Sequence, residues 1–189
     1  MSPRIRPAAT SDLDAAARVL AAAFETYSWT RWTIPADGYR TRLEEIQRLY
    51  LSHTLEHGLV LVDEQVSAVA AVLPADAADP PAPAQHRIAE LLGARLTALA
   101  GLDLPAAPVG SWTLETVGVH PARQGAGLGT AVIAAGLALI DRRGEPVALE
   151  TSDERNVHLY RRLGFATTAT TAIPAGPVVY SMSRTTSRG

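Results

Sequence analysis

Apolar residues recur with a helical period in two segments of the first part of the chain. One helix is expected to follow the candidate capping residues Thr10, Ser11 and Asp12 and to run to about Phe24. A second is expected over residues 39–57, ending at Gly58. Residues 27–35 separate these segments and are rich in aromatic side chains. Their pattern is too irregular for the interior of a helix, so no helix is expected there.

Short β-branched runs indicate strands next to these helices. We expect a strand over residues 5–7 and a hairpin made of residues 58–62 and 66–73. A proline-rich stretch, residues 74–83, is predicted to be a linker within the domain. A further helix is expected over about residues 85–100.

The second half of the chain alternates strands and helices more regularly. Strands are predicted over residues 111–119, 146–151, 166–173 and 178–183, and helices over residues 129–143 and 153–163. This alternation predicts an α/β or α+β fold. With 189 residues, 47% apolar and 19% charged, we expect one domain over residues 1–184 and a flexible tail over residues 185–189.

Composition removes several kinds of chemistry. All 17 basic residues are Arg, which excludes a P-loop or Schiff-base lysine, and the lack of Cys excludes thiolate metal sites and a Cys nucleophile. The net charge of −2 gives no reason to expect a nucleic-acid or membrane partner. The N-terminus has no apolar signal core, so we expect a cytoplasmic protein, and the excess of Ala and Arg indicates a bacterial, G+C-rich coding bias.

His53, Glu56 and His57 match a zinc-protease pattern of two His one helical turn apart with an acid between them. The motif falls in the last turn of a predicted helix, where the helix dipole favours His without any metal. No other His or acid cluster completes the pattern along the chain. We therefore expect no metal site.

Residues 124–129, Gln-Gly-Ala-Gly-Leu-Gly, are the strongest local signal. They lie between an apolar strand ending at Val119 and a helix beginning at about Gly129, so backbone N–H groups and a helix N-terminus converge there. Glycine also lets the backbone approach an anion closely. The segment predicts a phosphate-binding loop, and a merely tight strand-to-helix turn is the alternative.

A dinucleotide-binding loop is one interpretation of these glycines. It requires G-x-G-x-x-G directly after a strand and an acid about 20 residues later, a place that Glu150 fills. However, Thr130 or Val132 stands where the third Gly is needed. An NAD(P)-dependent oxidoreductase is therefore the weaker alternative.

The loop also satisfies the pattern Q/R-x-x-G-x-G/A through Gln124, Gly127 and Gly129. With Asn156 and Tyr160 after it, and Gly164 and Phe165 after those, the segment resembles the GCN5-related N-acetyltransferase (GNAT) superfamily, which uses acetyl-CoA. The resemblance implies a central twisted mixed sheet of about six to seven strands flanked by helices. It also implies acetyl-CoA as co-substrate, no metal, and a monomer or homodimer.

In that superfamily the loop amides hold the CoA pyrophosphate, and the preceding strand pairs its backbone with the pantetheine. The resemblance therefore implies that acetyl-CoA binds to Val117, Gly118, Val119, Gln124, Gly125, Ala126, Gly127, Leu128, Gly129, Thr130, Asn156 and Tyr160. Gln124 stands where many relatives have Arg. Charge at the phosphates would then come from Arg123, Arg155, Arg161 or Arg162.

Tyr160 is implied to protonate the leaving thiolate. Its hydroxyl suits this role, because an ordinary Tyr pKa of about 10 exceeds the roughly 8.5 of a thiol. Asn156 lies four residues earlier, so both side chains face one ligand from the same side of a predicted helix.

The acceptor amine must lose a proton before it attacks a thioester, so a base is needed. Glu115 and Glu150 are the candidates. Glu115 shares strand parity with Val117 and Val119, so its side chain is predicted on their face of the strand. Glu150 ends the neighbouring strand, where open α/β sheets place their ligands.

A closer resemblance, to the puromycin N-acetyltransferase family and its actinobacterial relatives, extends over nearly the whole chain, in residues 21–31, 112–129, 149–152, 155–165 and 173–184. It implies that Tyr27 and Trp32 line the acceptor pocket. The expected activity is acetyl transfer from acetyl-CoA to a primary amine of a small molecule, with an aminonucleoside or other amine antibiotic as the candidate acceptor. An acetyl-CoA sensor without transfer activity is the other alternative.

Overall fold

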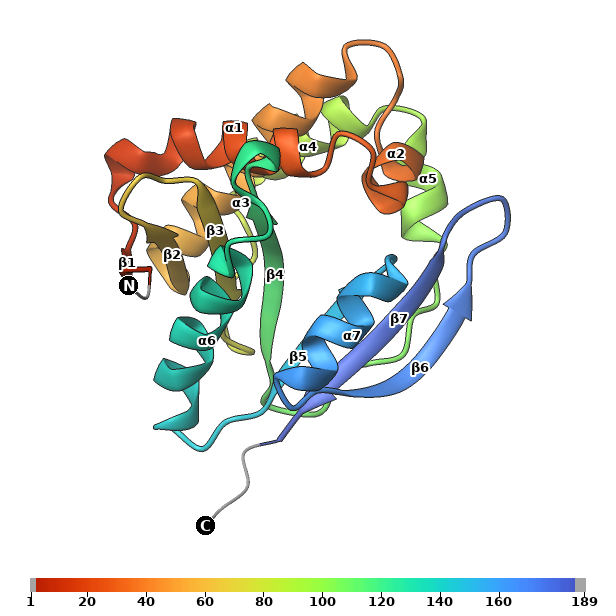
Figure 1. Cartoon of the computed structure of the whole chain (residues 1–189). Coiled ribbons are helices and arrows are strands. Elements are labelled where there is room, and N and C mark those ends of the chain that lie inside the picture. The colour runs from red at the N-terminus through yellow and green to blue at the C-terminus, as the bar shows by residue number, and fades with distance from the viewer. Residues whose placement is uncertain (1–2, 186–189) are drawn as a thin grey trace.

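Seven strands form one twisted sheet in the computed structural model, which describes residues 3–185 (Figure 1). Their order is β1-β2-β3-β4-β5-β7-β6, and β4 and β5 are the parallel pair among otherwise antiparallel neighbours. The strands are β1 Ile5–Pro7, β2 Leu59–Asp63, β3 Ala68–Leu73, β4 Trp112–Val119, β5 Val147–Thr151, β6 Ala166–Ala172 and β7 Val178–Arg184.

Helices cover both faces of this sheet (Figure 1). On one face α1 (Leu13–Ala23) and α3 (Tyr39–His57) pack against the strands β2 to β4. On the other, α6 (Leu128–Asp141) packs against β1 to β4 and α7 (Glu154–Arg162) against β5 and β6. The remaining helices are α2 Ser28–Thr33, α4 Ala82–Leu92 and α5 Arg95–Ala100, with single 3₁₀ turns at Thr10–Asp12 and Pro121–Arg123.

Side chains that alternate along β3 divide the apolar core between the two faces. Val72 belongs to the cluster that includes Ile133 of α6, whereas Ala71 belongs to the cluster that includes Leu20 of α1. Gly118 of β4 allows α1 to lie close to the sheet, because a Cβ there would come within 2.7 Å of the Leu20 side chain. Burial on both faces thus fixes where β4 runs.

The predicted fold class is confirmed, and the predicted strands are all present. One prediction is wrong in residues 27–35, where the structure has the short helix α2. The Thr30 hydroxyl lies 3.1 Å from the carbonyl oxygens of Phe24 and Tyr27, and the Tyr39 hydroxyl donates to Thr30 Oγ1 at 2.8 Å. These tertiary bonds stabilise a turn that the local sequence does not favour.

A second prediction is wrong in residues 85–100, which form two helices and not one. The first helix ends at Leu92, and its C-cap residue Gly93 has a φ of +54°, in the left-handed region. The first of these helices also begins earlier, at Ala82, inside the predicted linker. Pro83 is compatible with that start because the first turn of a helix needs no N–H donor there.

The parallel strands β4 and β5 are paired only where both begin. In the described chain the pairs are Trp112 with Val147 and Thr113 with Ala148, and beyond them the strands separate. The β5-facing edge of β4 is therefore left without a strand partner toward Val119. This opening positions the candidate site.

Within residues 3–185, no helix combines the length and apolarity needed to cross a bilayer. The predicted C-terminal tail, residues 185–189, lies outside the described residues apart from Thr185.

Candidate acetyl-transfer site

The loop between β4 and α6 borders a cavity of about 260 Å³, called the glycine-loop cavity from here on. Gly125 and Gly127 have φ values of +82° and +76°, a conformation that favours glycine over residues with a Cβ. The first-turn N–H groups of α6 have no partner within the helix, and the helix dipole is positive at this end. The lining residues are Val119, Arg123, Gln124, Gly125, Gly127, Leu128, Gly129, Thr130 and Leu159.

Gln124 lines this cavity and also uses its side-chain amide within the loop. Its Nε2 donates to the carbonyl oxygen of Val119 at 3.1 Å, so the side chain holds the loop against the end of β4. Arg123 lines the cavity and can supply positive charge there. By contrast, Arg155 is paired with Asp153 at 2.6 Å, and Arg161 lies 3.4 Å from the Thr167 hydroxyl.

A larger cavity of about 510 Å³, called the central cavity from here on, lies around the opening between β4 and β5. Its walls come from all parts of the chain. Predicted site residues among them are Tyr27, Glu115, Val117, Glu150, Asn156 and Tyr160, and the other aromatic members are Phe24, Trp29 and Tyr50. Sequence elements separated by more than 100 residues therefore meet at this point.

Glu115 reaches the cavity from a β-bulge. Leu114 pairs with Val72 and Thr116 with Ala71, so Glu115 is an extra residue with no partner on β3. The predicted parity of Glu115 with Val117 is therefore wrong, because a bulge interrupts the alternation of a strand. Val117 packs toward α6, whereas the Glu115 carboxylate lies near Tyr50 of α3.

Glu115 and Glu150 are both in an unfavourable place for negative charge. Burial raises the pKa of the Glu115 carboxyl, and the nearby Glu150 raises it further. Burial also raises the pKa of Glu150, although the Ser181 hydroxyl opposes part of that rise. Both side chains still have accessible surface and line the cavity. A raised pKa makes a carboxylate a stronger base, which suits the removal of a proton from an amine.

Tyr160 lies on α7 with only 8% of its surface exposed, and its ring meets Phe165 edge-on at a centroid distance of 5.7 Å. Burial raises the pKa of its hydroxyl well above the ordinary value, and the nearby Tyr27 adds to the shift. The group is therefore protonated at neutral pH. A protonated Tyr at the cavity wall can act as a hydrogen-bond donor or a general acid.

The hydroxyl of Tyr27 is held by the end of β5. It accepts a hydrogen bond from the Ser152 amide at 2.8 Å and lies 3.1 Å from Thr151 Oγ1. Asn156 Nδ2 donates to the same Thr151 oxygen at 3.3 Å. The ring of Tyr27 lines the central cavity, but its hydroxyl and the Asn156 amide join α2, β5 and α7 together.

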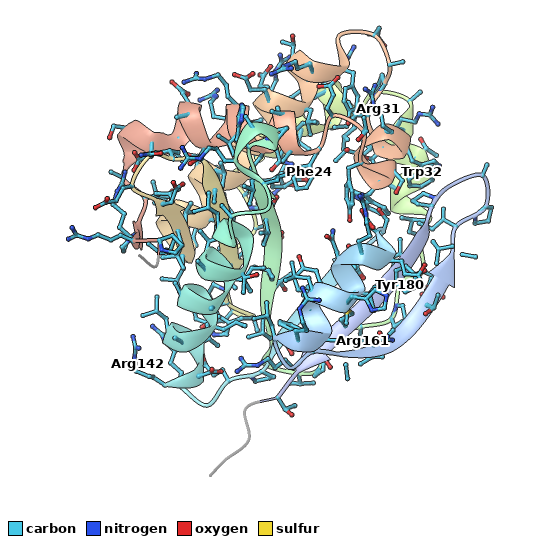
Figure 2. All side chains as sticks on the ribbon, viewed as in Figure 1. Phe24, Arg31, Trp32, Arg142, Arg161 and Tyr180 are labelled. Atoms are coloured by element: carbon cyan, nitrogen blue, oxygen red, sulfur yellow. The ribbon has the colours of Figure 1, made fainter. Side chains whose placement is uncertain are left out.

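Trp32 is not where the sequence predicts it. It does not line the central cavity and instead packs against Trp29 at 5.7 Å, beside the turn between β6 and β7 (Figure 2). Trp29 lines the cavity in its place. The two Trp residues lie three positions apart on α2 and their rings are in contact, but only Trp29 lines the cavity.

The rings of His53 and His57 on α3 lie tilted against each other, with their centroids 4.6 Å apart. His53 is buried and neither of its ring nitrogens has a hydrogen-bond partner in the described chain. Within residues 3–185 no three His, Cys, Asp or Glu side chains come together around these rings or elsewhere in a group able to hold a metal ion.

The structure thus divides the predicted acetyl-CoA residues between two cavities. Val117, Asn156 and Tyr160 line the central cavity, and the loop residues line the glycine-loop cavity. Gly118 and Ala126 line neither. The sequence did not predict Phe24, Trp29, Tyr50 and Thr151 as residues of the central cavity. They belong to separate segments of the chain and share no motif, so their aromatic or polar character was the only available signal.

Residues 87–167 match the model of the acetyltransferase (GNAT) domain. Among solved structures, the histone acetyltransferase HPA2 and related acetyltransferase of Corynebacterium glutamicum is 24% identical, with a TM-score of 0.79 over 100% of this chain and 99% of that one. The ribosomal-protein-S18-alanine N-acetyltransferase of Escherichia coli is 17% identical, with a TM-score of 0.59 over 100% and 96% of the two chains.

A third similar structure was determined with coenzyme A. It is the PaiA N-acetyltransferase of Thermoplasma acidophilum, 11% identical, with a TM-score of 0.63 over 98% of this chain and 99% of that one. The domain match supports the enzyme class predicted from the sequence. Residues 87–167 thus match an acetyltransferase (GNAT) domain model, and the chain as a whole shares the fold of these solved acetyltransferases.

Proposed function

We propose that this chain transfers the acetyl group of acetyl-CoA to a primary amine of a small molecule, by direct attack within a ternary complex. One observation carries the proposal. The unpaired edge of β4 leads from the central cavity at Glu115 and Val117 to the glycine-loop cavity at Val119. A phosphate-binding end and an acid–base end are thereby joined by one open strand.

The residues present fit acetyl-CoA as a co-substrate. The left-handed glycines leave open space where a Cβ would otherwise stand, so the loop amides are accessible to a diphosphate. Arg123 supplies a charge beside them. The unpaired β4 edge offers N–H and C=O groups to an amide-containing chain, as a neighbouring strand would.

The acid–base groups around the opening account for the proton movements. Glu115 takes the proton of the acceptor ammonium, and the neutral nitrogen attacks the thioester carbon. The C–N bond forms and the C–S bond breaks, the sulfur takes the proton of Tyr160, and the second proton lost by the nitrogen returns to the Tyr160 oxygen. An N–H of β4 near Val117 stabilises the oxygen that becomes negative during attack. Glu150 is the alternative base, on the same grounds of burial and position.

The acceptor side supports a flat or aromatic amine. Phe24, Tyr27 and Trp29 place rings on the cavity wall, and such walls bind planar groups. This agrees with an aminonucleoside or another amine antibiotic, the acceptor implied by the sequence resemblance.

Release of free CoA thiol measures the proposed reaction. Acetyl-CoA should give thiol with at least one member of a panel of aminonucleosides, aminoacyl amines, polyamines and aminoglycosides. Thermal stabilisation by CoA without thiol release from any amine would indicate an acetyl-CoA sensor. Stabilisation by NAD(P) and not by CoA would instead favour the oxidoreductase.

A further inference from the structure

The charge on the wall of the central cavity is entirely negative. Glu115 and Glu150 line it, whereas none of the Arg or His residues within residues 3–185 does. Neither carboxylate forms an ion pair with any described residue. Within the described residues, these two acids therefore have no counter-charge in the cavity.

Acetyl transfer to an amine uses only one of the two carboxylates. The reacting ammonium gives up its proton to a base and is then neutral, so it leaves the other carboxylate unpaired. Both residues are exposed to the open cavity, but their carboxyls are partly desolvated there, lack a counter-charge and repel each other. A second positive charge on the acceptor would compensate for it.

We propose that the acceptor is a dibasic amine, whose second cationic group binds Glu150 while its first amine reacts beside Glu115. This rests on the proposed function and narrows its substrate class. Glu115 stands in the bulge of β4, the strand with the open edge. Glu150 stands on β5, which is paired with β7 at this point, so it belongs to the rigid side of the opening.

A second observation points to a ligand at Glu150. Ser181 lies directly opposite it on β7 and lines the same cavity. Its hydroxyl is buried and lies near the Glu150 carboxyl, whose pKa it lowers, but it meets no described residue at full hydrogen-bond geometry. An ammonium carries three N–H donors and no acceptor, so a carboxylate and a hydroxyl side by side are suitable partners for it.

The aromatic wall is consistent with the same ligand. Trp29 and Tyr50 line the cavity, and aromatic faces attract organic cations. The acceptor would then be a molecule with an apolar or aromatic body and basic nitrogens at two points. A polyanionic acceptor is disfavoured by the same charges.

Three acceptors that differ at one position test this proposal. They are 2-phenylethylamine, its 4-aminomethyl derivative, and its neutral 4-hydroxymethyl derivative. The dibasic compound should have a kcat/KM about tenfold or more above both others, mainly through a lower KM, because one desolvated charge pair is gained. Added salt should reduce this preference little, because the pair is partly buried.

Two variants locate the effect. Glu150→Gln should remove the preference for the dibasic compound, so that its kcat/KM falls to that of the neutral 4-hydroxymethyl compound. Glu64→Gln removes a negative charge on the surface, where Glu64 pairs with Arg4, and should leave the preference intact. Binding of the dibasic compound in the presence of CoA, measured by calorimetry, should weaken in Glu150→Gln and provides a readout besides turnover.

The proposal is overturned if the three acceptors have equal kcat/KM, or if Glu150→Gln lowers kcat equally for all of them, since Glu150 would then be the base. Failure of the proposed function gives a different result, namely no thiol release from any amine and no CoA binding. Turnover of monobasic amines without a preference for the dibasic compound would contradict the proposed dibasic acceptor and leave the proposed acetyl transfer intact.

Discussion

The glycine-loop cavity and the central cavity are built from different materials. Backbone amides of one continuous segment and a helix N-terminus make the first, with Arg123 as its charged side chain. Residues of α2, α3, β3, α4, α5, β4, β5, α7, β6 and β7, with loop residues between them, make the second, and its charges are two acids. The first suits a phosphate whatever the rest of the molecule is, whereas the second can change its ligand through single substitutions. In the proposed function the first would hold the co-substrate phosphates and the second would select the acceptor.

Tyr160 lies at the wall of the central cavity, and removing its hydroxyl should have the largest effect. Tyr160→Phe is expected to lower kcat by about 100-fold or more, because a positioned general acid is lost. The ring stays in place against Phe165, so the affinity for CoA should be unchanged. Steady-state kinetics and CoA calorimetry measure the two effects. Unchanged turnover would contradict the role given to Tyr160.

Replacing Glu115 should cause the second-largest loss of activity and should also change the pH dependence of the reaction. Glu115→Gln is expected to lower kcat by about 10- to 100-fold through loss of a base. In the unmodified chain kcat/KM should fall in acid through a pKa above the ordinary Glu value, because burial and Glu150 raise that of Glu115. Glu150→Gln should shift this fall to lower pH, since the repulsion is removed. If kcat/KM falls at the same pH in Glu150→Gln as in the unmodified chain, Glu115 is not the group that titrates in this pH range.

Glu115→Gln also tests whether desolvation of the Glu115 carboxyl lowers the stability of the folded protein. A Glu whose pKa is raised by folding stabilises the protein most below its unfolded pKa, and that stability is lost as the pH rises through the folded pKa. Glu115→Gln removes this loss. Its Tm should therefore exceed that of the unmodified chain at neutral pH, and the difference should vanish in acid. A lower Tm at neutral pH would contradict the burial argument.

The two cavities also explain which predictions from sequence were possible. Residues 124–129 are contiguous, so the glycine loop and the helix after it could be predicted from spacing alone. Tyr160 and Asn156 could be paired because they lie one helical turn apart. The strand and helix order followed from local periodicity in the same way, which is why the sheet was predictable.

The acceptor wall could not be predicted to the same degree. Trp29 and Trp32 differ in their surroundings only because α2 is held by Thr30 and Tyr39, contacts that span the loop before α3. The bulge at Glu115 depends on the register of β3 with β4, two strands separated by about 40 residues of chain. Neither feature leaves a local pattern in the sequence.

The glycine loop should respond to strain more than to lost side chains. Gly127→Ala is expected to raise the KM for acetyl-CoA by about tenfold, because an L-residue at φ +76° costs about 1 kcal/mol and would shift the loop amides. Gly144→Ala is a matched control, since Gly144 has φ +70° and open space around it, in the turn after α6. Both variants should lose similar stability in urea. Equal KM values in the two would contradict a binding role for the loop.

Arg123 should have the smallest effect and the clearest salt dependence. Arg123→Gln is expected to raise the KM for acetyl-CoA about three- to tenfold, since one exposed charge-assisted contact contributes about 1 kcal/mol. The increase should shrink at high salt, because exposed charges are screened. Arg155→Gln is the control, as Arg155 is already paired with Asp153. If Arg155→Gln has the larger effect, the positive charge at the co-substrate phosphates comes from α7, and the glycine-loop cavity acts through its amides alone.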